Sequence, residues 1–401
     1  MSVSFNPAEL ARLDSFDVAG ALRLVFGNGC SSRVGELAKS VGGTRALLVT
    51  DAGIVTAGHA GAVTKSLSSA GLDVIPFLQV RENPTTRDVD ACLAVARDAR
   101  VDCIVGLGGG SSMDTAKGTN FLLTNGGRMQ DYWGVGKATK PMLPLIAIPT
   151  TAGTGSEMQC AALIADEVTH QKMACLDPKV LARVAILDPE LTLSQPARVA
   201  ACTGIDAVAH AVETAVTTKR TELSLAFSRE AFRLCASTLA RVLTAPADLP
   251  ARARMQLGAA FAGAAIEHSM LGAAHAAANP LTARFGIVHG HAVGLMLPHV
   301  IRFNAQLPSV RAPYFQLAAH AGLVESFDSE ACGVERLVKH VENLLQLSSL
   351  RQSLAELGVR RETISALAAE AAKQWTAGFN PRSVGVAEFT GLYEAAFEPR
   401  A

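Results

Sequence analysis

Short β-branched runs alternate with helical patterns in the first half of the chain and are almost absent from the second half. Between Arg45 and about Asp188, four runs have the character of buried strands: Ala46–Thr50, Val74–Leu78, Cys103–Leu107 and Leu145–Ile148. Strands separated by helices in this way predict a doubly wound, mostly parallel sheet that is covered on both faces. An earlier run, Leu22–Phe26, is a candidate edge strand, and a second subunit is one candidate for its partner.

After Leu193 the sequence consists of long Ala/Leu-rich stretches with helical period. We therefore expect an α/β N-terminal domain over residues 1–193 and an all-α C-terminal domain over 194–401. The junction lies near Leu187–Thr192, where Ser194 and Pro196 supply a helix start. A chain of 401 residues that is 49% hydrophobic has enough apolar material for two cores.

The charge balance excludes two classes of partner. Lys and Arg total 36 and Asp and Glu total 36, so there is no basic surplus to bind nucleic acid or an anionic membrane surface. The eight cysteines show no C-x-x-C spacing and indicate buried thiols of a reducing compartment. The first 20 residues lack a basic region followed by an apolar stretch, and we expect a cytoplasmic protein.

A glycine turn joins a strand to a helix in the first half. The apolar run Val101–Leu107 leads into Gly108, Gly109, Gly110 and Ser111, and a helical pattern follows. Glycines let the backbone approach an anion, and the N–H groups and dipole of the helix start favour its negative charge, as a pyrophosphate requires. Ser111 and Asp114 have capping-box spacing and are expected to fix the helix start. The alternative is a tight turn without a ligand, and the pattern is not G-x-G-x-x-G.

Two further polar positions lie where parallel strands end. The loop Pro149–Glu157, with Thr150, Thr151 and Thr154, is a candidate for holding the ribose and phosphates of a dinucleotide from the opposite side, and a plain surface loop is the alternative. Asp51 follows the first strand of the alternating region. Its carboxylate would either accept hydrogen bonds from the adenosine ribose, which favours NAD over NADP, or cap the next helix.

Histidines and a carboxylate in the second half suggest a metal site. Asp206 and His210 are four residues apart and share one helix face, His275 lies among small apolar residues, and His289 stands beside an expected helix start. Each histidine alone is more often structural, but an imidazole without a partner is costly to bury among alanines. The set suits Fe(II), Zn or Mn, and four protein ligands favour Fe(II), with Zn as the alternative. Polar residues near the set are candidates for supporting or structural roles: Glu213, His268, His291 and His299.

Ordered motifs along nearly the whole chain resemble the iron-containing (group III) alcohol dehydrogenases. The matching segments are Asn83–Thr85, Gly108–Lys117, Ile148–Glu157, Lys172, Ile186–Glu190, Gly204–Glu213, His289–Gly290, Leu297–His299 and Asn380–Arg382. The resemblance implies a dehydroquinate-synthase-like architecture, with a dinucleotide-binding domain, a helical domain, and cofactor and metal in a cleft between them. It also implies dimers or higher homo-oligomers.

Individual site residues follow from the resemblance. It implies that Asp206, His210, His275 and His289 hold the metal and are the catalytic residues, and that NAD and Fe(II) are the cofactors. The cofactor-binding residues are then Asp51, Asn83, Gly108, Gly109, Gly110, Ser111, Asp114, Thr150, Thr151, Thr154 and Lys172. The implied reaction is hydride transfer between a small alcohol and nicotinamide, with the metal polarising the substrate oxygen.

One position departs from the family pattern. Members commonly carry another histidine four residues after the third ligand, and this chain has Asn279 there. An amide relays no proton at neutral pH, so the proton would leave through water or through His291. The alternatives are a maleylacetate-reductase-like or glycerol-dehydrogenase-like oxidoreductase, a dehydroquinate-synthase-like lyase, and an inactive NAD-binding homologue.

Overall fold

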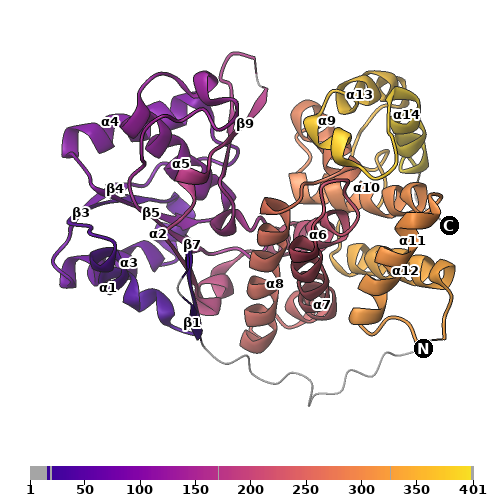
Figure 1. Ribbon diagram of the computed structural model, residues 1–401, viewed down its shortest axis with the longest axis horizontal. Helices are drawn as coiled ribbons and strands as arrows, with labels where there is room; N and C mark the ends of the chain where they lie inside the picture. The colour runs from indigo at the N-terminus through magenta and orange to yellow at the C-terminus, as the bar shows by residue number, and fades with distance from the viewer. Residues whose placement is uncertain (1–15, 19, 170, 326, 399–401) are drawn as a thin grey trace. The chain divides into compact units, whose positions relative to one another are not determined.

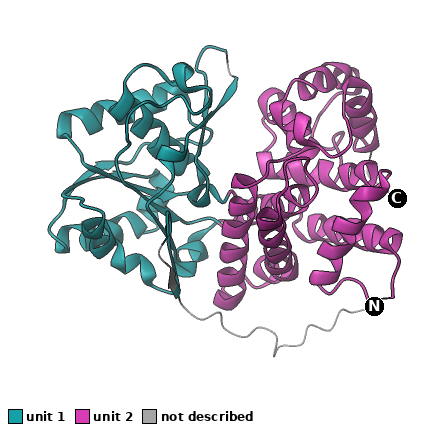
Figure 2. Ribbon diagram, in the orientation of Figure 1, with its two compact units in different colours: residues 1–151, 155–195 teal, residues 152–154, 196–401 magenta. Residues whose placement is uncertain are grey.

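The computed structural model describes residues 16–18, 20–169, 171–325 and 327–398, which belong to two compact units (Figures 1 and 2). The first unit comprises residues 1–151 and 155–195, and the second comprises residues 152–154 and 196–401. Three residues of the polar loop, Ala152–Thr154, therefore belong to the second unit although both flanks of the loop belong to the first. Most of the first 20 residues, in which the sequence shows no basic region followed by an apolar stretch, lie outside the described residues.

The first unit is built on a seven-stranded sheet whose order is β1-β2-β10-β7-β5-β3-β4. Its strands are β1 (Phe16–Val18), β2 (Arg23–Phe26), β10 (Val184–Leu187), β7 (Leu145–Pro149), β5 (Cys103–Gly108), β3 (Arg45–Val49) and β4 (Asp73–Phe77). All pairings are parallel except that of β1 with β2. The four strands expected from the β-branched runs and their parallel arrangement are confirmed.

The expectation that Leu22–Phe26 forms an edge strand was wrong. Strand β2 has neighbours on both sides, because β10 pairs with it in parallel and β1 pairs with it in antiparallel fashion. The sequence pattern also missed β10 and a second sheet of order β6-β9-β8, made of Gly134–Val135, Lys172–Leu176 and Ala161–Ala165. Strand β6 has only two residues, too few for an alternating pattern to show.

Helices cover both faces of the large sheet, as the fold class requires (Figure 1). Ala46 and Leu48 of β3 point to the face packed by α1 (Val34–Ser40) and α3 (His59–Ser69). Leu47 and Val49 point to the opposite face and share a core with α4 (Thr86–Ala99) and α5 (Gly110–Asn125). Both faces of each central strand are thus buried, which explains their nearly continuous apolar sequence.

The second unit is helical, as expected. Its helices are α6 (Ala197–Thr214), α7 (Glu222–Thr244), α8 (Leu249–Glu267), α9 (Ala273–Phe285), α10 (His289–Asn304), α11 (Pro308–His320), α12 (Glu330–Leu347), α13 (Ile364–Ala371) and α14 (Val386–Ala395). Helix α6 begins after Pro196, its N-cap, whereas Ser194 ends a preceding 3-10 turn and does not cap α6. No helix within the described part of the chain is both long and apolar enough to cross a membrane.

Small residues let α6 lie close to its neighbours in the core of this unit. A Cβ atom on Gly204 would lie 2.3 Å from Leu239 Cδ1 of α7. A Cβ atom on Gly290 of α10 would lie 2.1 Å from the backbone oxygen of Cys202. Since no side chain fits at either position, glycine sets the spacing between α6 and the helices packed against it.

Candidate functional site

Helix α6 presents three ionisable side chains on one face. Asp206, His210 and Glu213 follow at intervals of four and three residues, so their side chains lie one above another along the helix. All three are buried. The Nε2 atom of His210 lies 3.5 Å from Oδ1 of Asp206. The helix therefore places one carboxylate and one imidazole side by side in the interior of the unit.

Helix α9 brings His275 to the same point. Its Nε2 atom also lies 3.5 Å from Oδ1 of Asp206, and its ring stacks on that of His210 with centroids 4.8 Å apart. One potential ligand atom from each of Asp206, His210 and His275 lies within 4.8 Å of the other two. Asp206 and His275, which are 69 residues apart in the sequence, thus converge with His210 on one buried position.

Glu213 fixes both the start of α9 and the ring of His275. Its Oε1 accepts a hydrogen bond from the Ala274 N–H (2.7 Å) and its Oε2 accepts one from the Gly272 N–H (3.1 Å). Oε2 also lies 2.5 Å from His275 Nδ1. A carboxylate at this atom keeps a proton on Nδ1, so Nε2, which faces Asp206, is the ring nitrogen available to a cation.

His289 stands beside this cluster at the first position of α10. Its ring centroid is 5.4 Å from that of His275, and the two rings are tilted by 55°. The next residue, Gly290, makes this approach feasible because its missing side chain lets α10 contact the backbone of α6 at Cys202. The structure therefore brings all four expected ligand residues together, with Asp206, His210 and His275 closest.

Opposing effects set the charges in the cluster. Burial alone would raise the pKa of Asp206, but His210, His275 and His289 together lower it well below its usual range. Burial opposes protonation of His275, yet the Glu213 and Asp206 carboxylates raise its pKa to about 9. For His210 burial dominates and lowers the pKa. The two buried carboxylates thus create a local negative potential that attracts positive charge.

These residues fit a divalent cation. Asp206 Oδ1 and His275 Nε2 are buried atoms without a hydrogen-bond partner, and a cation bound between them would satisfy both. Imidazole nitrogen and carboxylate oxygen are donors that Fe(II) and Zn accept. The Glu213–His275 contact is the arrangement in which a carboxylate behind a metal-binding histidine orients it.

Replacing Glu213 by Gln tests this arrangement. A glutamine amide lacks the charge and offers only one acceptor oxygen, so it cannot hold the Gly272 and Ala274 N–H groups and His275 at once. We expect Glu213→Gln to weaken metal affinity by about 10–100-fold, measured by competition with a chelator. The same substitution at Glu342, which pairs with Arg302 at 2.8 Å on the surface, is the control and should leave metal affinity unchanged.

The other three histidines that the sequence offered as supporting candidates are His268, His291 and His299, and their contacts are of the kind that stabilise the fold. His268 is exposed at the end of α8, and its ring stacks on Phe227. The Nε2 atom of His291 lies 2.8 Å from the carbonyl of Arg351. Burial lowers the pKa of His299 to about 4. Glu213, in contrast, lies 2.5 Å from His275 Nδ1, and its spacing of three residues from His210 is the sequence signal for it.

Several expected cofactor residues gather where β5 leads into α5. Gly108 has φ 144°, and a Cβ atom there would lie 2.4 Å from Ser112 Oγ and 3.4 Å from Asp51 Oδ2. The Gly108 carbonyl accepts a hydrogen bond from the Thr150 N–H (3.0 Å), and Gly109 lies against Thr151. The Asn83 N–H donates to Ser111 Oγ (3.3 Å). The turn therefore exposes backbone at a helix N-terminus, which is a favourable site for a phosphate.

Both interpretations of Asp51 are compatible with its geometry. Its Oδ1 accepts hydrogen bonds from the Gly53 and Ile54 N–H groups, so Asp51 caps α2 (Ala52–Thr56). Its Oδ2 is on the side of Gly108. One oxygen can therefore cap the helix while the other is directed toward the glycine turn.

The expected capping box of Ser111 and Asp114 was wrong. Helix α5 begins at Gly110, its N-cap is Gly109, and no side chain caps it. Burial raises the pKa of Asp114 to about 6, against the opposing effects of Lys117 and Lys172 and of a hydrogen bond from the backbone of Leu163. Asp114 thus lies among Lys117, Lys172 and β8. Thr154, the remaining candidate, belongs to the helical unit.

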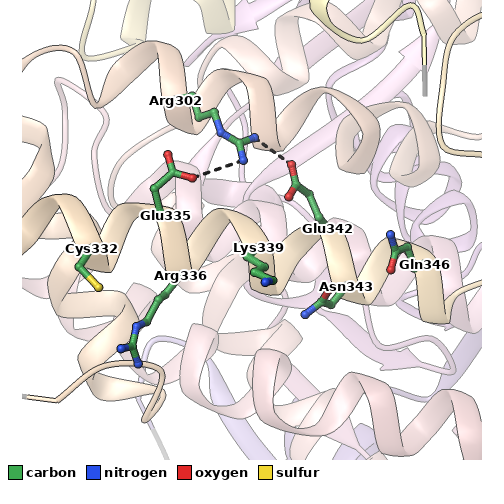
Figure 3. A pocket seen from close by; sticks show the side chains of 8 residues that line it. All are labelled: Arg302, Cys332, Glu335, Arg336, Lys339, Glu342, Asn343 and Gln346. Atoms are coloured by element: carbon green, nitrogen blue, oxygen red, sulfur yellow. Dashed lines mark hydrogen bonds and ion pairs between the residues drawn. The ribbon is translucent and has the colours of Figure 1, made fainter. Parts of the chain in front are cut away.

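A separate groove of about 350 Å³ lies on the surface of the helical unit (Figure 3). Charged side chains of α12 and Arg302 of α10 line it, and Arg302 forms ion pairs with Glu335 (3.5 Å) and Glu342 (2.8 Å). These ion pairs lie within the groove, and none of its lining residues belongs to the cluster of Asp206, His210 and His275.

Comparisons with known proteins agree along most of the chain. Residues 21–189 match the family described as iron-containing alcohol dehydrogenase, and residues 200–397 match the C-terminal region of that family. The NAD-dependent methanol dehydrogenase of Bacillus methanolicus is 34% identical over 372 residues, covering 93% of this chain and 97% of its own. The lactaldehyde reductase of Escherichia coli K12 is 32% identical over 375 residues, covering 93% and 97%.

A solved structure shows the same fold. The crystal structure of a 1,3-propanediol oxidoreductase superimposes with a TM-score of 0.91 at 32% identity, covering 96% of this chain and 99% of its own. Its fold, the two matching family regions and the identity to curated relatives all point to one assignment. The chain belongs to the iron-containing alcohol dehydrogenase family, and thus to the oxidoreductases that act on CH–OH groups.

Proposed function

We propose that this protein is a metal-dependent, NAD-linked alcohol dehydrogenase and aldehyde reductase that transfers hydride between a small alcohol and nicotinamide. The observation that carries the proposal is the convergence of Asp206, His210 and His275 on one buried point beside His289. NAD and iron as cofactors agree with the family and with its NAD-dependent relatives.

Each residue of the cluster has a defined task in this proposal. Asp206, His210, His275 and His289 would hold the cation, which when bound supplies Lewis-acid polarisation of the substrate oxygen. Glu213 holds the Nδ1 proton of His275 and so keeps Nε2 available. Burial of Asp206, His210 and His275 limits access of water to the charged groups and strengthens their electrostatic effect.

The turn between β5 and α5 would bind the dinucleotide. The backbone at Gly108–Ser111 and the N-terminus of α5 favour a pyrophosphate. Asn83, Thr150 and Thr151 lie beside this turn and would surround the phosphates. We include Asp114, Thr154 and Lys172 in the cofactor site from the family pattern. Asp51 would accept hydrogen bonds from the adenosine ribose and repel a 2′-phosphate.

Asp51→Asn separates the two tasks of this residue. Asparagine keeps an acceptor oxygen for the N–H groups of α2 but removes the charge, so we expect the preference for NAD over NADP, as the ratio of kcat/KM, to fall by at least about tenfold. Asp51→Ala loses both features and should in addition lower the thermal stability. An unchanged ratio in Asp51→Asn would show that Asp51 acts only as a cap.

Asn279 suggests how the proton leaves the site. Its Nδ2 donates to Gln374 Oε1 (3.0 Å), so a neutral amide pair stands one helical turn after His275. His291, the other candidate, is engaged with the Arg351 carbonyl, and burial lowers its pKa. We therefore favour release of the proton to water over release through His291.

The test is metal analysis of anaerobically purified protein together with NADH-coupled assays on primary, secondary and polyhydroxy alcohols. We expect about one divalent ion per chain and reduction of NAD with at least one small alcohol. The relatives are named for methanol, lactaldehyde and 1,3-propanediol, so the panel should begin with short substrates. Full metal loading and tight NAD binding without turnover on any substrate would favour an inactive homologue instead.

Location and assembly complete the proposal. We propose a cytoplasmic homo-oligomer, at least a dimer, whose mass light scattering coupled to gel filtration would measure. All eight cysteines are free, which agrees with a reducing compartment.

A further inference from the structure

A buried lysine of α5 connects the glycine turn to the polar loop. Lys117 has no solvent exposure. Its Nζ donates to the carbonyls of Ser156 (2.7 Å), Gln159 (2.7 Å) and Ala161 (2.9 Å), and it lies 3.0 Å from Ser156 Oγ. A buried ammonium is costly unless oxygen atoms surround it. The backbone of residues 156–161 supplies them here.

Two acidic side chains near Lys117 interact electrostatically with its positive charge. Burial raises the pKa of Glu157 to about 7 and that of Asp114 to about 6, and Lys117 opposes both shifts. The positive charge of Lys117 therefore interacts with a carboxyl group on its own helix and with one on the loop. This attraction adds to the hydrogen bonds that hold the lysine between α5 and the loop.

The polar loop is thus fastened at both ends to the strand and helix that form the glycine turn. At its start, the Thr150 N–H donates to the carbonyl of Gly108, the last residue of β5. At its end, Ser156 is held by Lys117 of α5. Because α5 is a continuous helix from Gly110 to Asn125, Lys117 transmits the position of the helix start to the end of the loop.

We propose that Lys117 is a positioning residue of the cofactor site, which fixes the loop carrying Thr150 and Thr151 relative to the turn at Gly108–Ser111. This inference rests on the proposed function, because it assumes that the turn and loop hold a dinucleotide. Lys117 would act through the loop backbone and would not itself contact the cofactor. A small displacement of the loop would then reduce binding, since polar contacts tolerate little misplacement.

The test compares Lys117→Arg with Asn120→Ala in the full-length, metal-loaded protein. Arginine keeps the charge, but its planar guanidinium cannot reproduce the compact arrangement of oxygens around an ammonium. Asn120 lies on the same helix and is also buried, but it exchanges hydrogen bonds with Leu143 (2.9 and 3.0 Å), away from the polar loop. It is therefore a matched control for loss of stability in this part of the unit.

For Lys117→Arg we expect the affinity for NADH, measured by nicotinamide fluorescence, to weaken by at least about tenfold. The KM for NAD should rise, while kcat should change by less than about threefold. Metal content should remain that of the unchanged protein. Ser156→Ala, which removes only the hydroxyl from the set around Lys117, should act in the same direction but less strongly. Asn120→Ala should lower the melting temperature without changing NADH affinity.

Two results would overturn the inference. If NADH affinity is unchanged in Lys117→Arg and Ser156→Ala, or falls equally in Asn120→Ala at a matched loss of melting temperature, Lys117 serves stability alone. If the unchanged protein does not bind NADH, the proposed function fails, and this inference fails with it. The two failures are distinguished by the affinity of the unchanged protein, which the same titration measures.

Discussion

Substituting His275 by Ala is expected to remove the metal and to lower turnover by at least about a thousandfold while the fold persists. The Nε2 atom of His275 is one of the buried donors that converge on Asp206, and it has no hydrogen-bond partner. The fold should persist because Glu213 still accepts the N–H groups of Gly272 and Ala274 after the imidazole is lost. Metal content by mass spectrometry, turnover and circular dichroism measure the three effects.

The control for this variant is His268→Ala, another histidine of the helical unit. His268 is exposed and stacks on Phe227, so its loss should leave metal content and turnover within about twofold of the unchanged protein. If His275→Ala keeps both its metal and its turnover, the assignment of the ligands is wrong. Loss of metal in both variants would instead indicate that the site responds to general destabilisation.

Gly290→Ala is expected to have the second largest effect. The added methyl group would lie 2.1 Å from the Cys202 carbonyl oxygen and 3.1 Å from Asp206 Cβ, so α10 must move away from α6. Overpacking against backbone costs about 1–3 kcal/mol or more. Because His289 precedes Gly290, the same movement separates His289 from Asp206. We expect a lower melting temperature together with metal affinity reduced by at least about tenfold.

Gly391→Ala provides the comparison for this substitution. Gly391 lies in α14, and a Cβ atom there would meet nothing within 4 Å. Alanine in a helix interior is favoured over glycine by about 1 kcal/mol, so this variant should be at least as stable as the unchanged protein and should bind metal normally. Unchanged metal affinity in Gly290→Ala would show that the cluster does not depend on the close approach of α10.

The sequence was most informative where periodicity and chemistry coincide. The runs that became β3, β5 and β7 are buried on both faces and therefore show as continuous apolar segments. Asp206 and His210 could be paired because a helix places residues four apart on one face. The short strand β6 and the β8–β9 pair carried no such signal.

Other features depend on contacts that spacing does not encode. Ser111 and Asp114 have the spacing of a capping box, but tertiary contacts take each of them elsewhere, Ser111 to Asn83 and Asp114 to the neighbourhood of Lys172. The convergence of His275 on Asp206 follows from how α9 packs against α6, which no local pattern specifies. For the same reason the four oxygens around Lys117 could not be foreseen from the sequence.

The membership of Ala152–Thr154 in the helical unit limits how this chain can be recombined with its relatives. Ala152 is part of the apolar core of that unit, and Gly153 lies so near Thr203 that a Cβ atom would come within 2.4 Å of Thr203 Cβ. In a chimera whose first 195 residues come from a relative, residues 152–154 of that relative would have to pack against α6 of this chain. Exchange of either half therefore requires that residues 152–154 come from the same parent as α6.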